Sequence, residues 1–160
     1  MGSGKTTAGK KLAALMGWSF IDLDERTESA AAMKIPEIFS HFGEEYFRKS
    51  ESETLHELEN LDDAVISTGG GAPCYNENME FMLASGLTVY LKLTPEQLKN
   101  RLSQSKTDRP LLKDLKGIDL LDFIREKLSQ REKYYDRADI IIQDVDIDIN
   151  QMFKLVKAAL

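Results

Sequence analysis

Short apolar runs alternate with helical segments along this chain, and that alternation limits its fold more than any other feature. The runs occupy residues 20–24, 64–68, 88–93 and 139–143, and they are rich in β-branched residues and nearly continuously apolar. Continuous apolarity is typical of strands that are covered on both faces, as in a parallel sheet. We therefore expect an α/β fold in which helices flank a parallel sheet.

The segments between these runs show helical spacing and recognisable helix ends. Gly17 is well suited to end the first helix, and Thr94 and Gln97 form a capping box around Pro95 at the start of a later one. We expect helices over residues 5–16, 44–61, 78–84, 95–103, 120–135 and 149–160.

Composition excludes several classes of protein. A length of 160 residues suits one domain, residues 1–160, and a net charge of −6 argues against nucleic acid or an anionic membrane surface as a partner. No apolar run approaches the roughly 18 residues of a membrane span. One cysteine and two distant histidines, His41 and His56, are too few for a disulfide or a zinc site. We expect a single-domain protein of the cytoplasm.

The chain begins Met-Gly-Ser-Gly-Lys-Thr-Thr, directly before the first predicted helix. In a phosphate-binding loop, glycines let backbone N–H groups converge on phosphate oxygens, a lysine reaches the β- and γ-phosphates, and a Ser or Thr hydroxyl holds Mg²⁺. Gly2, Gly4, Lys5 and Thr6 fit the last positions of that motif. The alternatives are a flexible start before an ordinary helix, or an N-myristoylation signal at Gly2.

The motif is incomplete at its start. Its first glycine would stand two residues before Met1, and no apolar run that could feed the loop as a strand precedes it. A strand and the absent part of the loop amount to about 7–8 residues. We expect either that the chain starts at an internal methionine of a longer one or that it lacks this first strand.

Two aspartates stand at the end of the first apolar run. Asp22 and Asp24 are two residues apart, so a strand would point both side chains to one face. The carboxyl end of a strand is where open α/β sheets bind ligands. Two carboxylates beside a phosphate loop are suited to position Mg²⁺ and a substrate hydroxyl. The alternative role for these aspartates is as a helix N-cap or in a turn.

Three consecutive glycines, Gly69, Gly70 and Gly71, directly follow the second apolar run. Because they carry no Cβ atoms, a ligand can approach their backbone N–H groups closely. The alternative is a flexible turn, and the nearby Cys74 is interpreted as a packing residue.

Two arginines, Arg48 and Arg131, recur with apolar side chains at helical spacing and so face inward on their predicted helices. An inward guanidinium must find a partner, because burying an unpaired charge is prohibitive. Two converging arginines would hold a substrate carboxylate bidentately. Arg48 would equally be satisfied by Glu51, three residues further along its helix.

A polar stretch over about residues 104–116 is interrupted by Pro110 and is too irregular for a helix. It would serve as a lid that brings Arg109 onto a transferring phosphoryl group. The alternative is an ordinary surface loop.

Taken in order, GSGKTT, FIDLD, GEEYFRKSE, STGGG, TDRPLL and the late arginine of SQREKYY resemble the motifs of the shikimate kinases, which are nucleoside-monophosphate-kinase-like P-loop proteins. The resemblance covers essentially the whole chain. It implies a three-layer P-loop kinase fold whose five-stranded parallel sheet has the order 2-3-1-4-5, so the absent first strand is a central one. A chain that starts at Met1 would then fold poorly or be completed by another molecule, and would otherwise be a monomer.

The resemblance also implies a reaction, the transfer of the γ-phosphoryl group of ATP to the 3-hydroxyl of shikimate with Mg²⁺. Lys5, Asp24 and Arg109 would be the catalytic residues, with Asp24 on the shikimate hydroxyls and Arg109 in the lid. The implied residues for nucleotide and metal are Gly2, Ser3, Gly4, Lys5, Thr6, Thr7, Asp22, Arg101 beside the adenine, and Arg109, with Thr6 and Asp22 serving the metal. Those implied for shikimate are Asp24, Arg48, Gly69, Gly70, Gly71, Arg131, Phe39 and Phe47, several of them in a helical region over about residues 25–61.

Two other functions compete with this interpretation. A gluconate-type sugar-acid kinase of the same fold also needs an arginine for a carboxylate, but it does not predict the D-x-D, GGG and RPLL segments together. A non-catalytic nucleotide-binding protein is favoured by the incomplete phosphate loop. The adenine contacts are open as well, because the proline that often follows the adenine-contacting aspartate in the family is absent after Asp144.

Overall fold

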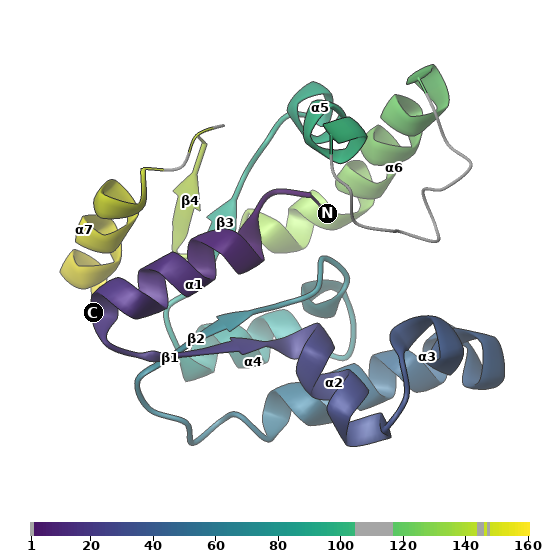
Figure 1. Cartoon of the computed structure of the whole chain (residues 1–160), viewed down its shortest axis with the longest axis horizontal. Coiled ribbons are helices and arrows are strands. Elements are labelled where there is room, and N and C mark those ends of the chain that lie inside the picture. The colour runs from purple at the N-terminus through teal and green to yellow at the C-terminus, as the bar shows by residue number, and fades with distance from the viewer. Residues whose placement is uncertain (1, 105–116, 144–145, 147) are drawn as a thin grey trace.

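A computed structural model describes residues 2–104, 117–143, 146 and 148–160 of the chain. Its strands are β1 (Ser19–Asp22), β2 (Ala64–Ser67), β3 (Val89–Leu91) and β4 (Ile140–Ile142). Its helices are α1 (Lys5–Met16), α2 (Leu23–Ala31), α3 (Ile35–His56), the short 3-10 helix η1 (Ala72–Cys74), α4 (Asn78–Ser85), α5 (Pro95–Gln104), α6 (Gly117–Tyr135) and α7 (Ile149–Ala159). Figure 1 shows their arrangement.

Local signals in the sequence set most of these boundaries. α1 ends where predicted, because Gly17 adopts the left-handed conformation with φ 71° and closes the helix. The capping box at α5 forms as predicted: the Gln97 backbone N–H donates to Thr94 Oγ1 at 3.2 Å, and the Thr94 N–H donates to Gln97 Oε1 at 2.8 Å. All four predicted strands form, each shorter than its apolar run.

Several boundaries differ from the predicted ones. α3 begins at Ile35 rather than residue 44, α6 begins at Gly117 rather than residue 120, and α2 was not predicted as a separate helix. The first strand stops at Asp22 rather than residue 24, because the Asp22 carboxylate accepts hydrogen bonds from the Asp24 and Glu25 N–H groups and starts α2. α3 ends at His56 rather than residue 61, since the Leu58 and Glu59 N–H groups bond to carbonyls only three residues back, as in turns. α3 also changes direction at Gly43, whose φ is 81°.

The strands form two separate parallel pairs, β1 with β2 and β3 with β4. In the first pair Asp22 lies opposite Ser67, so the chain leaves both strands at the same edge. In the family's order 2-3-1-4-5, removing strand 1 leaves strands 2 and 3 as one pair and strands 4 and 5 as another. These pairs correspond to β1–β2 and β3–β4 of this chain, which confirms the expected topology.

An apolar cavity of about 790 Å³ lies between the two pairs. It is bounded by Val65 of β2 and Leu91 of β3, and by side chains of the surrounding helices, among them Leu12, Met79 and Met152. Within the described ranges, neither β2 nor β3 has a strand partner on the side that borders this cavity. Each pair therefore has an open edge facing the other.

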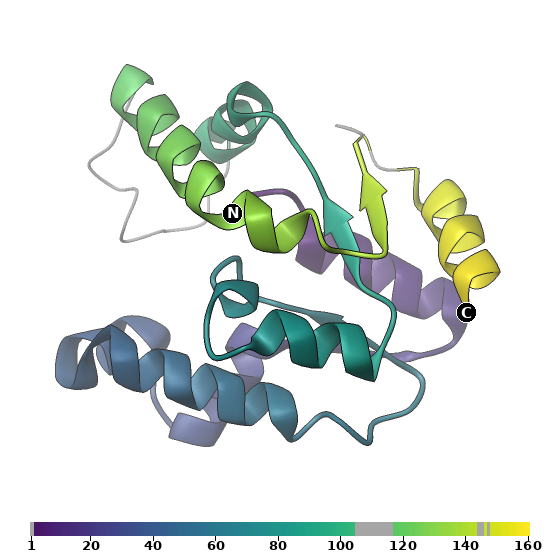
Figure 2. The same ribbon diagram turned by 180° about the vertical axis from the view of Figure 1, so that it is seen from behind.

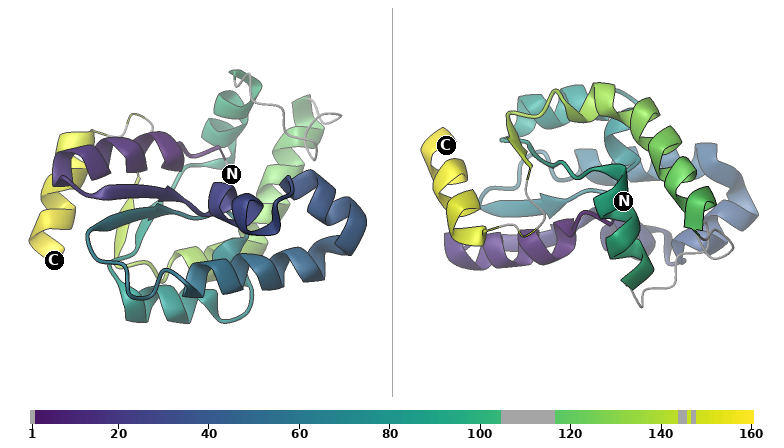
Figure 3. Two further views of the ribbon diagram at one scale, coloured as in Figure 1. Left: turned by 60° about the horizontal axis from the view of Figure 1, so that its bottom comes forward. Right: turned by 90° about the horizontal axis from the view of Figure 1, so that it is seen from above.

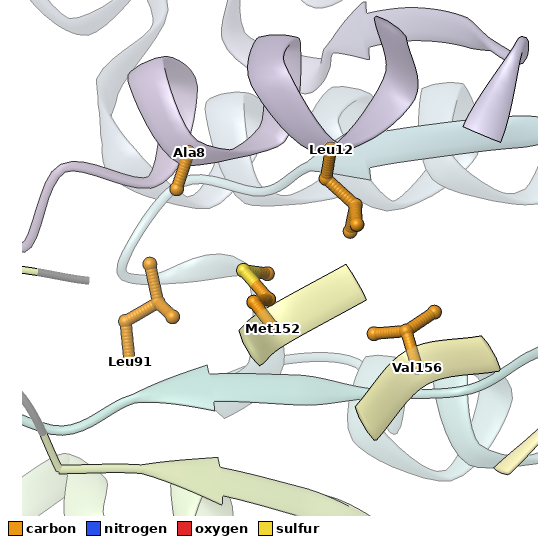
Figure 4. Packing of buried hydrophobic residues seen from close by; sticks show 5 residues of the cluster. All are labelled: Ala8, Leu12, Leu91, Met152 and Val156. Carbon is orange, nitrogen blue, oxygen red and sulfur yellow. The ribbon is translucent and has the colours of Figure 1, made fainter. Parts of the chain in front are cut away.

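Helix α1 connects the two pairs of strands. It packs on β1 and β2 and lies beside α7, while α3 and α4 cover the opposite side of the same strands (Figures 2 and 3). Ala8 and Leu12 of α1 form one buried cluster with Leu91 of β3 and with Met152 and Val156 of α7 (Figure 4). This cluster holds the halves of the molecule together on one side of the cavity.

Candidate active site

The N-terminal loop has the backbone geometry of a phosphate site. Gly2 and Gly4 adopt positive φ values of 66° and 88°, which other residues rarely tolerate. α1 begins directly after Gly4 with no side-chain cap and no acidic residue in its first turn. Its N-terminal N–H groups and its dipole are therefore available to an anion.

Arg101 of α5 lies against this loop. Its Nη1 donates to the carbonyl oxygen of Ser3 at 3.0 Å, and a Cβ added to Gly4 would lie 2.9 Å from the same nitrogen. The loop is thus in contact with a second cation besides Lys5. Thr7, the last residue of the motif, lies exposed in the first turn of α1.

Thr6 and Asp22 meet beside the loop. The Thr6 hydroxyl donates to Asp22 Oδ2 at 3.1 Å, while Asp22 Oδ1 caps α2. A hydroxyl and a carboxylate are oxygen donors of the kind that Mg²⁺ prefers, and the metal usually takes only one or two protein ligands together with nucleotide phosphates. The residues present therefore fit a magnesium ion. Among the described residues no three acidic, Cys or His side chains cluster as a metal site.

Asp24 lies in the first turn of α2, not on the strand from which its orientation was predicted. Burial raises the pKa of its carboxyl group, and the neighbouring Asp22 charge raises it further. The Lys5 and Arg48 cations oppose this shift. The pKa of Asp24 is therefore influenced both by Lys5 of the phosphate loop and by Arg48 of α3.

Arg48 is held on two sides by carboxylates of its own helix. Its Nη1 donates to Glu51 at 2.8 Å and its Nη2 to Glu44 at 3.2 Å. The local pairing with Glu51 that the sequence left open is thus present. The Tyr75 ring lies 4.5 Å from the guanidinium carbon and its hydroxyl donates to Glu44. These contacts fix the guanidinium plane instead of leaving it mobile.

The three glycines bring the backbone against these charged groups. A Cβ on Gly69 would lie 2.7 Å from Asp24 Oδ1 and 3.0 Å from Glu51 Oε1. A Cβ on Gly71 would lie 2.6 Å from Arg48 Nη2. At these two positions only glycine fits without displacing a side chain, so the segment is more than a flexible turn.

Arg131 of α6 belongs to the same cluster. Its charge lowers the pKa of Glu51 and of Cys74, and in both groups burial outweighs it and raises the pKa. Glu51 pairs with Arg48 of its own helix and also responds to the charge of Arg131 on α6. Cys74 lies half-buried in η1 next to them, in keeping with a packing role.

Phe39 and Phe47 pack on each other within α3, with ring centroids 4.7 Å apart. Arg48 lies over the Phe47 ring at 5.0 Å. The two rings thus adjoin the arginine cluster. Arg109 and most of the predicted lid lie outside the described residues, as do residues 144 and 145 of the predicted adenine segment.

Sequence reasoning missed two residues of this cluster. Glu51 was considered only as a partner for Arg48, although it is 1% exposed and adjoins Gly69. Tyr135 stands at helical spacing from the apolar Ile124 and Leu128, and no role was predicted for it, yet its hydroxyl donates to the Gly70 carbonyl. A glutamate on an apolar stripe is a signal that could have identified Glu51. The hydrogen-bond partner of Tyr135 is 65 residues away in the sequence, so no local pattern indicated this contact.

Phosphate-binding and acidic groups thus meet at the carboxyl edge of parallel strands, where α/β proteins bind nucleotides and their co-substrates. That combination defines the class: a P-loop kinase that phosphorylates a small molecule. Comparison with known proteins then identifies the family. The shikimate kinase family model matches residues 1–160, and the chain belongs to this family. It catalyses the phosphorylation of shikimate by ATP.

Individual relatives agree with this assignment. The chain is 51% identical over 140 residues to the shikimate kinase of Parabacteroides distasonis, covering 88% of this chain and 81% of that protein. It is 42% identical over 164 residues to that of Bacteroides fragilis, covering 98% and 92%. The crystal structure of the Bacteroides thetaiotaomicron shikimate kinase superposes with a TM-score of 0.92 at 38% identity, covering 99% of this chain and 93% of that one.

A further solved structure is the Acinetobacter baumannii shikimate kinase in complex with shikimate. It matches with a TM-score of 0.85 and 33% identity, covering 99% of this chain and 87% of that chain. In the described ranges, every helix of the present chain is too short or too polar to cross a bilayer.

Proposed function

We propose that the residues at the carboxyl ends of β1 and β2 transfer the γ-phosphoryl group to the 3-hydroxyl of shikimate. The observation that carries this proposal is the position of Asp24, whose carboxylate lies against Gly69 of the same glycine turn that packs on the Arg48 guanidinium at Gly71. The Lys5 and Arg48 cations both lower the pKa of this carboxyl group. A donor phosphate bound at Lys5 and an acceptor carboxylate bound at Arg48 would bring an acceptor hydroxyl beside Asp24. Residues 1–160 would act as one kinase domain.

On the donor side, residues Gly2–Thr7 would cradle the phosphates of ATP. The backbone N–H groups at the start of α1 and the Lys5 ammonium would stabilise phosphate charge, and Arg101 would lie beside the adenine. Phosphoryl transfer has a largely dissociative transition state, so positioning and charge stabilisation supply most of the catalysis. The expected lid arginine, Arg109, would add charge at the transferring group.

Thr6 and Asp22 would hold Mg²⁺, Thr6 through its hydroxyl and Asp22 by way of water. Bound Mg²⁺ would supply positive charge that offsets the negative charge of the nucleotide phosphates. The hydrogen bond between Thr6 and Asp22 keeps both oxygens on the same side of the phosphate loop.

On the acceptor side, Arg48 and Arg131 would bind the shikimate carboxylate, for which the planar guanidinium is well suited. Asp24 would accept a hydrogen bond from the 3-hydroxyl and orient it, more than deprotonate it. Phe39 and Phe47 would line the cavity around the ring, and Gly69, Gly70 and Gly71 would let the substrate approach the backbone.

We also propose that the chain works in the cytoplasm, where ATP is supplied, and that it is a monomer unless a strand from another chain fills the cavity between β2 and β3.

An acceptor without a carboxylate tests the assignment of the arginines. Arg131→Lys should raise the KM for shikimate roughly ten- to hundred-fold, because a bidentate charged contact is lost. For the carboxamide analogue of shikimate the same substitution should change KM little, since this acceptor has no carboxylate to hold.

The matched control is Arg125→Lys on the same helix, where Arg125 is exposed and paired with Glu96. It should leave both KM values unchanged. Equal losses for shikimate and for its carboxamide in Arg131→Lys would contradict a carboxylate-binding role.

A further inference from the structure

Tyr135, the last residue of α6, connects the arginine helix to the glycine turn. It lies four residues after Arg131, on the same face of the helix. Its hydroxyl donates a hydrogen bond to the carbonyl oxygen of Gly70. Its ring packs on Tyr90 of β3, with the ring centroids 5.0 Å apart. The phenol is therefore held between β3, α6 and the glycine turn.

Arg131 lies one helical turn before Tyr135, so its charge acts on the same phenol. Burial raises the pKa of Tyr135, and the charge and hydrogen bond of Arg131 work against that rise. The phenol consequently stays protonated at neutral pH and remains a donor to Gly70. It can accept from Arg131 at the same time, because a hydroxyl has one donor and two acceptor positions.

The hydrogen bond to Gly70 fixes more than one atom. The peptide unit between Gly70 and Gly71 is planar and trans, so its carbonyl and its N–H point in opposite directions. Holding the Gly70 carbonyl toward α6 turns the Gly71 N–H away from α6. A Gly-Gly unit has no Cβ to restrict it, so it would otherwise rotate easily.

Gly71 is in turn packed against the other arginine. A Cβ at this position would lie 2.7 Å from the Arg48 guanidinium carbon. The turn is thus clamped between two helices that each carry an arginine, with Tyr135 on one side and Arg48 on the other. Loosening either side would change the spacing of the two guanidinium groups.

We propose that Tyr135 is a positioning residue for the acceptor: it fixes the Gly70–Gly71 peptide plane one helical turn away from Arg131. The ligand class is a small hydroxy acid, whose carboxylate meets two guanidinium groups and a backbone N–H held at a set spacing. This inference rests on the proposed acceptor site.

The test is Tyr135→Phe, which keeps the ring on Tyr90 and removes only the hydroxyl. We expect the KM for shikimate to rise roughly three- to ten-fold, the value of one neutral hydrogen bond. The KM for ATP should stay within about two-fold, because the phenol bonds to Gly70 of the acceptor turn and its ring packs on Tyr90. The control is Tyr134→Phe, the neighbouring tyrosine, which should change neither constant.

Two outcomes would overturn the inference. One is an unchanged KM for shikimate in Tyr135→Phe. The other is an equal rise in the KM for both substrates together with a lower unfolding temperature, which would show a merely structural role. Failure of the unsubstituted chain to phosphorylate shikimate would count instead against the proposed function.

A measurement on the unsubstituted chain tests the same proposal and does not depend on whether a variant folds. In ¹H–¹⁵N spectra the Gly71 amide resonance should shift when shikimate is added, whereas that of Gly86, at the end of α4, should not. A Gly71 resonance that does not respond to shikimate would contradict the proposal.

Discussion

The Asp24 carboxylate, which we expect to orient the acceptor, lowers the stability of the folded protein at neutral pH. Burial and the Asp22 charge hold the pKa of this carboxyl group above its ordinary value. A carboxylate with a raised pKa in the folded protein destabilises the fold at any pH above that pKa. The penalty shrinks as the pH falls through the folded-state pKa and vanishes below the unfolded-state value of about 3.9.

Replacing the Asp24 carboxylate with a neutral amide should therefore lower the activity and raise the free energy of unfolding at neutral pH. In Asp24→Asn we expect kcat to fall roughly 10²- to 10⁴-fold, the range for a group that orients or accepts a reacting proton. The unfolding temperature at pH 7 should rise by up to a few degrees, and the difference should disappear near pH 3. ATP binding should persist.

Steady-state kinetics and thermal unfolding at several pH values check this prediction, with the exposed Asp62→Asn as the control. An Asp24→Asn chain with normal turnover would remove Asp24 from the mechanism. One that unfolds at a lower temperature at pH 7 would contradict the raised pKa.

At the scale of elements, the glycine turn after β2 makes the site compact. It brings backbone against Asp24 and Glu51 at Gly69, and against Arg48 at Gly71. The register of β1 and β2 explains this contact, because Asp22 and Ser67 are opposite each other and the chains continue from there into α2 and the turn.

A methyl group added at this turn should therefore weaken binding of the acceptor and leave binding of the nucleotide nearly unchanged. We expect Gly71→Ala to displace the Arg48 guanidinium and to raise the KM for shikimate roughly ten- to hundred-fold, with little change in the KM for ATP. Gly86→Ala is the matched control, since a Cβ there meets nothing within 4 Å. Kinetics that are the same for both variants would show that Arg48 tolerates the methyl group.

The elements also show what the sequence could reveal. The end of α1 and the start of α5 were predictable because their signals are local, at Gly17 and at the capping box of Thr94. The end of the first strand was missed because Asp22 caps a helix that starts one residue later. Tyr135 was missed because its partner lies on a distant segment, which no local pattern records.

The whole molecule is two parallel strand pairs joined through α1, with a cavity of about 790 Å³ between them. The resemblance to a family, and not residue periodicity, predicted that the sheet would divide between these two pairs. The side chains around the cavity could not be assigned from sequence, since they come from many segments spread between Ser3 and Leu160.

The most direct test of this account is ADP release by the 160-residue chain with Mg-ATP, measured with shikimate, with gluconate and without acceptor. We expect release with shikimate alone. The specific activity should be independent of protein concentration for a monomer, and should rise with concentration if one chain completes another. Release with gluconate, or equal release without any acceptor, would contradict the account.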